Sequence, residues 1–475
     1  MKNDVIYVIF LLVLVISLKI STLYLDYYDD GRTYALQAKY LSIHGPISEY
    51  PGQPVHVPFF LWTLAIGYNI FGETPFLSHL IVAIFSFIGS FFTYLLGKHL
   101  FDEKIGIMAS LLLLFSPVYF SVSGQTLYDV PLTAMTAAVL YFYLRKKLPL
   151  YLIFACLLVL TKEPGTFVIL AILTHLFLKK ENAYNIILHS LPLIVVIIWM
   201  TSLFLKNNVD MPGMGMLHYG FFERGILFPL GRLIANIYQT FVWNYKWILT
   251  LSILFVLFRN KKLFSLKYLP FVLICIFYLF ALSFLPIYTQ PRYFLPVSMI
   301  FFIFSSFSLN YLFKNRSWII FIIIISLFIS CYRWNYGIKG LVQDPVFHSS
   351  IFYEKFHPRP LVYIESGGIS MDYIDAVDVE MKAREFITNN YPNSNIVTTG
   401  RVFKSLESYV NIGYAEWTKY NITILPPTKE NISRAHLVVY ESNFFVSDDI
   451  LEPLSNMSQV KKFEKNGVYI IIYKS

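Results

Sequence analysis

The sequence predicts an α-helical membrane protein with about eleven transmembrane helices, followed by an α/β domain outside the membrane. Hydrophobic residues make up 56% of the 475 positions. Charged residues make up 14%, well below the roughly 25% that is usual in soluble proteins. Apolar runs long enough to cross a bilayer recur between residues 5 and 333, whereas residues 334–475 have the composition of a soluble domain. We therefore expect two domains, 1–333 and 334–475.

The predicted spans follow the apolar runs in order. They lie at residues 5–25, 77–97, 105–123, 128–144, 149–161, 165–178, 184–205, 238–258, 268–287, 293–313 and 317–333. With a cytoplasmic N-terminus, nearly every basic cluster between these spans falls on the cytoplasmic side, as the positive-inside rule requires. Residues 57–71 are too short for a span, so we expect a helix along the interface there. The outer face then carries the loop 26–76, several turns and the C-terminal domain.

The C-terminal region alternates between helical and strand-like stretches. The segment "DAVDVEMKAREFITNNYP" starts with acidic residues and stops at Pro392, as a helix does. Four stretches rich in β-branched and aromatic residues are bounded by turn formers, namely "NIVTTG", "NITILP", "AHLVVYES" and "GVYIIIYK". We therefore expect a small extracytoplasmic α/β domain.

The charge and the cysteines exclude two classes of function. The formal charge of +9 comes from short basic clusters between apolar runs, which indicates membrane topology and not a nucleic-acid partner. The three cysteines, Cys156, Cys275 and Cys331, all lie in apolar runs. The sequence therefore predicts neither a disulfide framework nor a zinc site.

The densest charge cluster of the first outer loop is "YYDDGRTYAL", residues 27–36, which follows the first apolar run directly. One explanation for Asp29 and Asp30 is a solvated loop end. Alternatively, the amphipathic stretch that follows forms a helix and holds the carboxylates at its N-terminus, where the helix dipole favours negative charge. A carboxylate at the membrane surface is well placed to take a proton from a hydroxyl nucleophile. Arg32 and Tyr34 are further candidates in the same stretch.

The stretch "DGRTYALQAKYL" followed by "HVPFFLWTLAIGYNIFG" resembles the first outer loop of the membrane-integral GT-C glycosyltransferases. Among these it is most similar to the branch of protein O-mannosyltransferases and the lipid A aminoarabinose transferase. Aligned on Tyr34 and Ala38, the family's catalytic Asp falls on Asp30 and the Glu after it falls on Gly31. This departure leaves two assignments open, because Asp29 either supplies the second carboxylate or is itself the base. We favour Asp30 as the base.

Later motifs resemble the same family in the same order. "VHVPFFLW" contains His56, "LYDVPLTAMTAAVLYFYLR" contains Asp129, "LTKEPG" contains Lys162 and Glu163, and "QPRYFLP" contains Arg292. The resemblance implies that Arg292, Lys162 and His56 bind the donor phosphate. Asp129 and Glu163 are further site candidates. Each motif also has a purely structural explanation: a helix cap, a plain turn, an interfacial histidine, or an arginine that reaches the lipid headgroups.

The function implied by the resemblance is inverting transfer of a sugar from a polyprenyl (dolichyl-type) phosphate donor, held in membrane lipid, to an acceptor hydroxyl on the extracytoplasmic face. The alternatives are a transporter or flippase of a lipid-linked saccharide, and a membrane-anchored scaffold. We favour the enzyme because the charges gather at one surface and no inverted repeat is evident. No cofactor is certain, and a divalent metal stays open because the acidic pair with one histidine is too sparse to define coordination. The sugar, the acceptor, the prenyl chain and the oligomeric state are not predicted.

Overall fold

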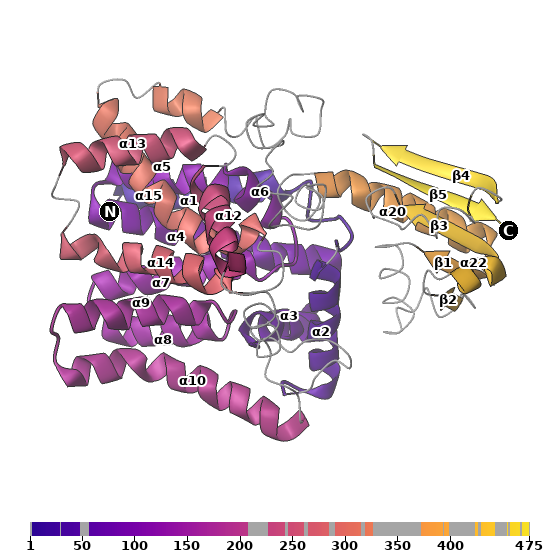
Figure 1. Ribbon diagram of the computed structural model, residues 1–475, viewed down its shortest axis with the longest axis horizontal. Coiled ribbons are helices and arrows are strands. Elements are labelled where there is room, and N and C mark those ends of the chain that lie inside the picture. The colour runs from indigo at the N-terminus through magenta and orange to yellow at the C-terminus, as the bar shows by residue number, and fades with distance from the viewer. Residues whose placement is uncertain are drawn as a thin grey trace.

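The computed structural model in Figure 1 contains a bundle of helices and, beyond one end of the bundle, a smaller α/β domain. The structure describes residues 2–28, 30–47, 57–207, 227–242, 246–260, 265–284, 290–314, 319–325, 372–392, 394–398, 423–425, 429–441, 454, 457–465 and 468–474. The domain boundary predicted at residue 333 lies outside these residues.

The described helices of the bundle follow one another along the chain. In order they are α1 (Lys2–Lys19), α2 (Asp30–His44), α3 (Phe59–Phe71), α4 (Pro75–Leu100), α5 (Glu103–Leu114), α6 (Pro117–Val122), α7 (Asp129–Leu144), α8 (Leu148–Val159), α9 (Gly165–Leu178), α10 (Ala183–Asn207), α12 (Leu227–Phe241), α13 (Lys246–Arg259), the 3-10 helix η3 (Leu266–Tyr268), α14 (Leu269–Ser283), the 3-10 helix η4 (Pro291–Phe294) and α15 (Leu295–Leu312). The helix predicted at 57–71 is present as α3.

Most predicted spans contain one helix with similar bounds. The first helix ends at Lys19 and not at residue 25. The span predicted at 105–123 is interrupted because α6 begins at Pro117, whose ring fixes φ and removes an N–H donor. The region predicted as one span at 238–258 is not a single continuous helix, because α12 and α13 cover it as two helices bent by 90°, which form either one broken span or a re-entrant loop. Of the predicted span 317–333, residues 319–325 are described and are helical.

Length and composition mark part of the bundle as able to cross a membrane. Four described helices are long and apolar enough, or five if the bent pair α12 and α13 forms one span. The apolar helices α3, α7, α8 and α9 have 12 to 16 residues. Helices of this length rise about 18 to 24 Å, so they need their flanking turns to cross a hydrocarbon core of about 30 Å. The total of eleven spans stays a prediction.

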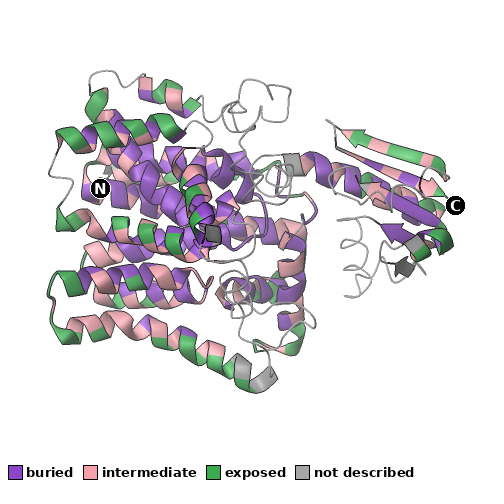
Figure 2. Ribbon diagram, in the orientation of Figure 1, coloured by how far each residue is buried: buried purple, intermediate pink, exposed green. Residues whose placement is uncertain are grey.

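The outer surface of the bundle is apolar. Figure 2 shows exposed residues along the outer sides of α10 and α13. Among them are large hydrophobic side chains, namely Ile194, Ile197, Ile198, Leu251, Phe255 and Phe258. Exposed rows of large apolar side chains along a helix are expected where the helix contacts lipid.

The centre of the bundle consists of α4, α5, α7 and α15, which pack tightly against one another. Close approach of α4 and α5 depends on Gly97 and Gly106. A Cβ atom on Gly106 would overlap the carbonyl oxygen of Tyr94, and one on Gly97 would lie 2.8 Å from Gly106 Cα. Small residues allow such contact between membrane helices. The ends of α7 and α15 are thereby held in fixed positions, and these ends carry the candidate site.

The C-terminal domain has one five-stranded sheet, with strand order β2-β1-β3-β5-β4. Its elements are α20 (Asp372–Asn390), β1 (Asn395–Thr398), β2 (Thr423–Leu425), α22 (Lys429–Arg434), β3 (Leu437–Glu441), β4 (Ser458–Lys465) and β5 (Val468–Lys474). β1 pairs in parallel with β2 and β3, whereas β5 is antiparallel to β3 and β4. The predicted helix and the four predicted strands are present. The fifth strand, β4, has the charged sequence "SQVKKFEK" of a strand at a sheet edge.

Candidate active site

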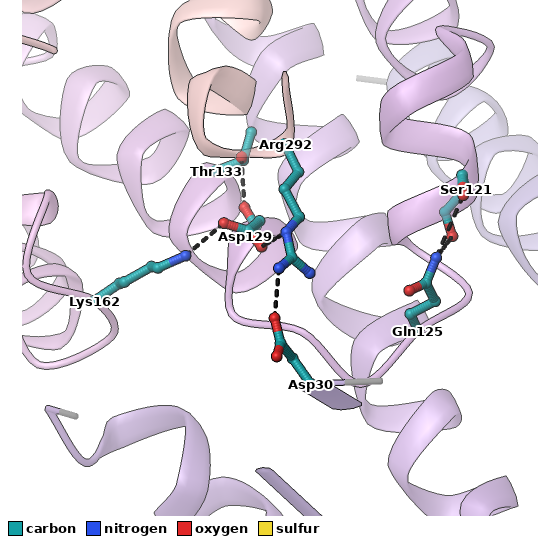
Figure 3. A network of polar contacts seen from close by, with 7 residues as sticks. All are labelled: Asp30, Ser121, Gln125, Asp129, Thr133, Lys162 and Arg292. Atoms are coloured by element: carbon teal, nitrogen blue, oxygen red, sulfur yellow. Dashed lines mark hydrogen bonds and ion pairs between the residues drawn. The ribbon is translucent and has the colours of Figure 1, made fainter. Parts of the chain in front are cut away.

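Four charged side chains from four separate elements form one chain of alternating sign. Asp30 Oδ2 accepts a hydrogen bond from Arg292 Nη2 at 2.6 Å. Arg292 Nε lies 3.8 Å from Asp129 Oδ2. On the other side of Asp129, Oδ1 accepts a hydrogen bond from Lys162 Nζ at 2.7 Å. Figure 3 shows the guanidinium between the two carboxylates. The cluster contains two negative and two positive charges.

The sequence places all four charges at the same end of the bundle. Asp30 and Asp129 are the first residues of α2 and α7, where the positive end of the helix dipole stabilises a carboxylate. Lys162 lies in the turn between α8 and α9, and Arg292 lies in η4 just before α15. The prediction that Asp30, Asp129, Lys162 and Arg292 share one face therefore agrees with their contacts.

The four charged side chains differ in how far they are exposed to solvent. The side chain of Asp30 is 38% exposed, whereas those of Asp129 and Arg292 are 2% and 4% exposed. Lys162 is 13% exposed. Asp30 is therefore the carboxylate that an entering molecule can reach, while Asp129 lies beneath it and binds the two cations. Arg292 Nε is buried and has no hydrogen-bond acceptor among the described residues.

Three tyrosines surround the charged cluster. The ring of Tyr34 packs edge-on against that of Tyr128, with centroids 4.6 Å apart. Lys162 Nζ lies 4.6 Å from the ring centroid of Tyr293, a distance at which the face of the ring attracts a cation. Burial, together with the negative charge of Asp30, raises the pKa of Tyr34 well above its usual value. The Tyr34 hydroxyl therefore keeps its proton.

Gly31, at the position of the family's glutamate, allows α2 to lie against the turn before α7. A Cβ atom on Gly31 would lie 3.3 Å from the carbonyl oxygen of Thr126 and 3.4 Å from its nitrogen. These main-chain atoms cannot move as a flexible side chain would. The departure from the family pattern therefore has a local cause, since a glutamate at residue 31 would press on the turn that leads to Asp129.

Two further candidates from the sequence, Arg32 and Glu163, contact residues outside the charged cluster. Arg32 points away from the cluster, because its Nη2 donates to the carbonyl oxygen of Tyr27 at 2.9 Å and lies 3.4 Å from Glu380 Oε2. Glu163 is partly buried and is close enough to Tyr128 to interact with it electrostatically. Asp29 and His56 lie outside the described residues.

Sequence reasoning missed Tyr128 and Tyr293 as components of the site. Each directly adjoins a residue that it did identify, in "LYDVP" and "QPRYFLP". It also missed two ion pairs between the two domains. Asp26 pairs with Arg384, and Glu380 pairs with Arg32. Their position next to identified residues could have indicated that the two tyrosines belong to the site. No local signal in the sequence connects α20 with the first outer loop.

The described residues do not assemble a metal centre. No group of three or more His, Cys, Asp or Glu side chains in this part of the chain is placed to hold a metal ion. Asp30 and Asp129 are each paired with Arg292, and Asp129 also binds Lys162. Their negative charge is thus balanced by side chains of the protein.

A cavity of about 480 Å³ lies at the other end of α7. Its lining includes Tyr143, Lys147, His175, Lys179 and His189. Residues 142–144 at this end of α7 are separated from Asp129 by most of the helix, about 20 Å at 1.5 Å per residue. The cavity is therefore distinct from the charged cluster.

The comparisons with known proteins concern the family model and the fold. Residues 53–205, which include Asp129 and Lys162, match the family model "Dolichyl-phosphate-mannose-protein mannosyltransferase". No curated protein matches the sequence.

Solved structures similar to the chain are membrane glycosyltransferases of the GT-C type. ArnT from Cupriavidus metallidurans bound to undecaprenyl phosphate aligns with a TM-score of 0.60 at 13% identity, over 98% of each chain. Its apo form aligns equally well, at 14% identity over 98% of this chain and 97% of ArnT. The oligosaccharyltransferase AglB from Archaeoglobus fulgidus, in complex with an inhibitory peptide and a dolichol-phosphate, aligns with a TM-score of 0.53 at 12% identity, over 98% of this chain and 74% of AglB. Residues 53–205 therefore match the model of the dolichyl-phosphate-mannose-protein mannosyltransferase family, and the whole chain has the fold of ArnT and AglB.

Proposed function

We propose that the chain transfers a sugar from a polyprenyl phosphate donor to an acceptor hydroxyl, with Asp30 as the general base. The observation that carries this proposal is the chain of contacts from the exposed Asp30 through Arg292 and Asp129 to Lys162. Its partly exposed carboxylate, Asp30, contacts Arg292, and Lys162 binds the far side of Asp129. A lipid-linked donor can reach such a place with its tail in the bilayer and its phosphate at the surface.

The reaction follows from the charges of its participants. The acceptor oxygen attacks the anomeric carbon, its proton passes to Asp30, and the bond from the anomeric carbon to the phosphate oxygen breaks. Displacement from the side opposite the phosphate inverts the anomeric centre. The donor phosphate, a monoanionic diester, leaves as a polyprenyl phosphate with one additional negative charge. Groups that bind this growing charge stabilise the transition state more than the ground state.

Arg292 and Lys162 supply the positive charge that the leaving phosphate needs. Arg292 Nε is buried without an acceptor and can donate to a phosphate oxygen, and guanidinium matches phosphate in a bidentate arrangement. Asp129 holds Arg292 and Lys162 in place before the donor arrives, so little reorganisation is required during the reaction. We assign Tyr34 as a neutral hydroxyl beside Asp30. Asp29 is the second carboxylate or the alternative base, and His56 is a further candidate for binding the donor phosphate.

The relatives support a lipid donor without naming the acceptor. ArnT binds undecaprenyl phosphate and AglB binds a dolichol-phosphate in their structures. We accordingly assign the donor to the polyprenyl phosphate sugars, in membrane lipid, and the reaction to the extracytoplasmic face, with the N-terminus in the cytoplasm. The C-terminal domain then lies on the side where the acceptor arrives.

A divalent cation at this site would need ligands beyond the described residues. A structure of the Archaeoglobus fulgidus oligosaccharyltransferase contains zinc. In the chain described here, Asp30 is the one exposed carboxylate of the cluster and Arg292 already occupies one of its oxygens. We therefore assign charge stabilisation to Arg292 and Lys162.

The test is sugar transfer by the purified full chain in lipid nanodiscs, with a panel of synthetic polyprenyl phosphate sugars. Asp30→Asn should abolish transfer while the protein stays folded, because Asp30 is partly exposed and its loss leaves Arg292 paired with Asp129. Asp102→Asn is the matched control. Asp102 is also an aspartate at a helix start, where its side chain accepts a hydrogen bond from the Ile105 N–H, and an asparagine caps a helix as well as an aspartate does. Undiminished transfer by Asp30→Asn would rule out Asp30 as the base.

A further inference from the structure

Helix α20 of the C-terminal domain contacts the bundle beside the acidic motif. Glu380 Oε2 lies 3.4 Å from Arg32 Nη2, and Arg384 Nη1 lies 2.6 Å from Asp26 Oδ2. None of the four side chains is more than 16% exposed. The two pairs are opposite in sign, because α20 presents an acid to a base and, one turn later, a base to an acid. This arrangement fixes both the position and the direction of α20 on the bundle.

Asp26 and Arg32 also hold the main chain that leads to Asp30. Asp26 Oδ1 accepts the N–H of Tyr27 at 2.8 Å, and Arg32 Nη2 donates to the carbonyl oxygen of Tyr27 at 2.9 Å. Both polar main-chain groups of Tyr27 are therefore bound by side chains that pair with α20. Because Asp30 begins α2 shortly afterwards, a shift of α20 is transmitted to the backbone that carries the proposed base.

An apolar contact supports the ion pairs. Ala376 and Val377 of α20 are buried in one cluster with Leu18, Tyr28 and Phe120 of the bundle. Figure 2 shows this end of α20 as buried where it meets the bundle. The interface thus excludes water from the side on which Glu380 and Arg384 lie, which strengthens both pairs.

The other contacts of α20 attach it firmly to its own sheet. Lys465 Nζ of β4 lies 3.2 Å from Asp375 and 3.0 Å from Asp378. A neighbouring face of the helix packs on the sheet through Val379, Ala383 and Ile387. α20 is therefore a rigid connection between the C-terminal sheet and the acidic motif.

We propose that Glu380 and Arg384 are positioning residues for the reaction. By fixing Arg32 and Asp26, they hold the segment before α2 so that Asp30 stays at its place beside Arg292. This inference rests on the proposed function, because it takes Asp30 as the base. Neither residue belongs to the phosphate-binding cluster, so their loss should lower kcat and leave the KM for the donor unchanged.

The kinetic test compares charge-removing variants of α20 in the full chain. Glu380→Gln and Arg384→Gln should each lower kcat by about tenfold or more, since a misplacement of about 1 Å at a reacting group can cost about a hundredfold. Arg384→Lys, which can still reach Asp26 with a positive charge, should recover most of the native kcat. Glu385→Gln and Lys382→Gln are the matched controls, because both side chains are exposed on the same helix.

A distance measurement tests the docking without any assay of transfer. Spin labels at Ile43 of α2 and Met381 of α20, both exposed, are introduced as cysteines after replacement of the native cysteines. Pulsed electron paramagnetic resonance should give one narrow distance distribution for the native interface and for both control variants. Glu380→Gln and Arg384→Gln should broaden it.

The outcomes separate the two proposals. A native protein that turns over no polyprenyl phosphate sugar overturns the proposed function, while the distance distribution still reports whether α20 is docked. Native kcat in Glu380→Gln and Arg384→Gln, with a broadened distribution, overturns the positioning role and leaves the proposed function standing. A fall in kcat accompanied by an equal rise in donor KM also overturns it, because that result places the defect in donor binding.

Discussion

Arg292 donates a hydrogen bond to Asp30 at 2.6 Å, although 262 positions separate them in the sequence. The bond joins the first helix after the N-terminal span to the start of α15. The guanidinium binds the carboxylate that we propose as the base. A donor phosphate that binds the guanidinium would release one oxygen of Asp30 to receive the acceptor proton. Under the proposed function, Arg292 would thereby couple donor binding to activation of the base.

Replacement of Arg292 by lysine should be severe although the charge is conserved. Lysine has no planar array of donors and cannot contact Asp30, Asp129 and a phosphate at the same time. We expect kcat/KM for transfer to fall by about a hundredfold or more, the usual effect of removing a donor that binds transition-state charge. Steady-state kinetics of Arg292→Lys against Arg145→Lys, at the opposite end of α7, measures it. Equal activity of the two variants would contradict a bidentate role.

Asp129→Asn should affect stability as well as activity. Asp129 is 2% exposed and shares its carboxylate between Arg292 and Lys162. Removing one partner of a buried ion pair costs about 3 to 5 kcal/mol, because uncompensated charge stays buried. We expect a lower apparent Tm together with lost transfer, whereas Asp30→Asn loses transfer at nearly native Tm. Thermal unfolding in detergent of Asp129→Asn, Asp30→Asn and the control Asp102→Asn measures this. Equal and nearly native Tm values for Asp129→Asn and Asp30→Asn would mean that the ion pairs of Asp129 do not stabilise the fold.

The sequence predicted the helices well because lipid leaves a spanning chain few other choices. It misread the region of α12, whose buried face carries Arg232, Asn236 and Gln239. These polar residues lower the average hydropathy, so the prediction started the span at residue 238, inside the helix. The edge strand β4 was missed for a similar reason, because its charged residues interrupt the run of β-branched and aromatic residues by which a strand is predicted.

The site was predicted as a set of motifs but not as a network. Order along the chain and alternation of the spans placed Asp30, Asp129, Lys162 and Arg292 on one face. The pairing of Arg292 with both carboxylates depends on the packing of α15 against α7 and could not be read from any local pattern. The same holds for Glu380 and α2, whose contact arises from the docking of two domains.

Gly31→Ala should impair transfer by a steric effect. The added Cβ atom would lie 3.3 Å from the Thr126 carbonyl oxygen, and main chain must shift to accept it. Since Asp30 precedes this residue directly, we expect kcat to fall while donor KM changes little. Gly67→Ala is a suitable control, because its Cβ meets the flexible end of the Ile81 side chain at 3.1 Å. Native kcat in Gly31→Ala would show that the turn yields without moving Asp30.

Chelation of metal ions should leave transfer intact. In the proposed function, Arg292 and Lys162 provide the positive charge that stabilises the leaving phosphate. We expect unchanged kcat after exhaustive dialysis against EDTA, with residual metal measured by inductively coupled plasma mass spectrometry. Loss of transfer that added Mg²⁺ or Mn²⁺ restores would instead indicate a cation held with Asp29 or His56.

Tyr34→Phe should reduce transfer by a factor that does not change with pH. Burial, followed by the charge of Asp30, raises the pKa of Tyr34 well above its usual value of 10.0. The raised pKa favours the protonated hydroxyl, so below about pH 9 the folded and unfolded states both keep this proton and no pH dependence arises from it. The ratio of native to Tyr34→Phe rates should therefore be constant between about pH 6 and 9, where an unperturbed tyrosine is also neutral. Tyr24→Phe, at an exposed position of the same region, serves as control. A ratio that falls steadily as pH rises would mean that Tyr34 ionises, which would place its hydroxyl in the proton transfer itself.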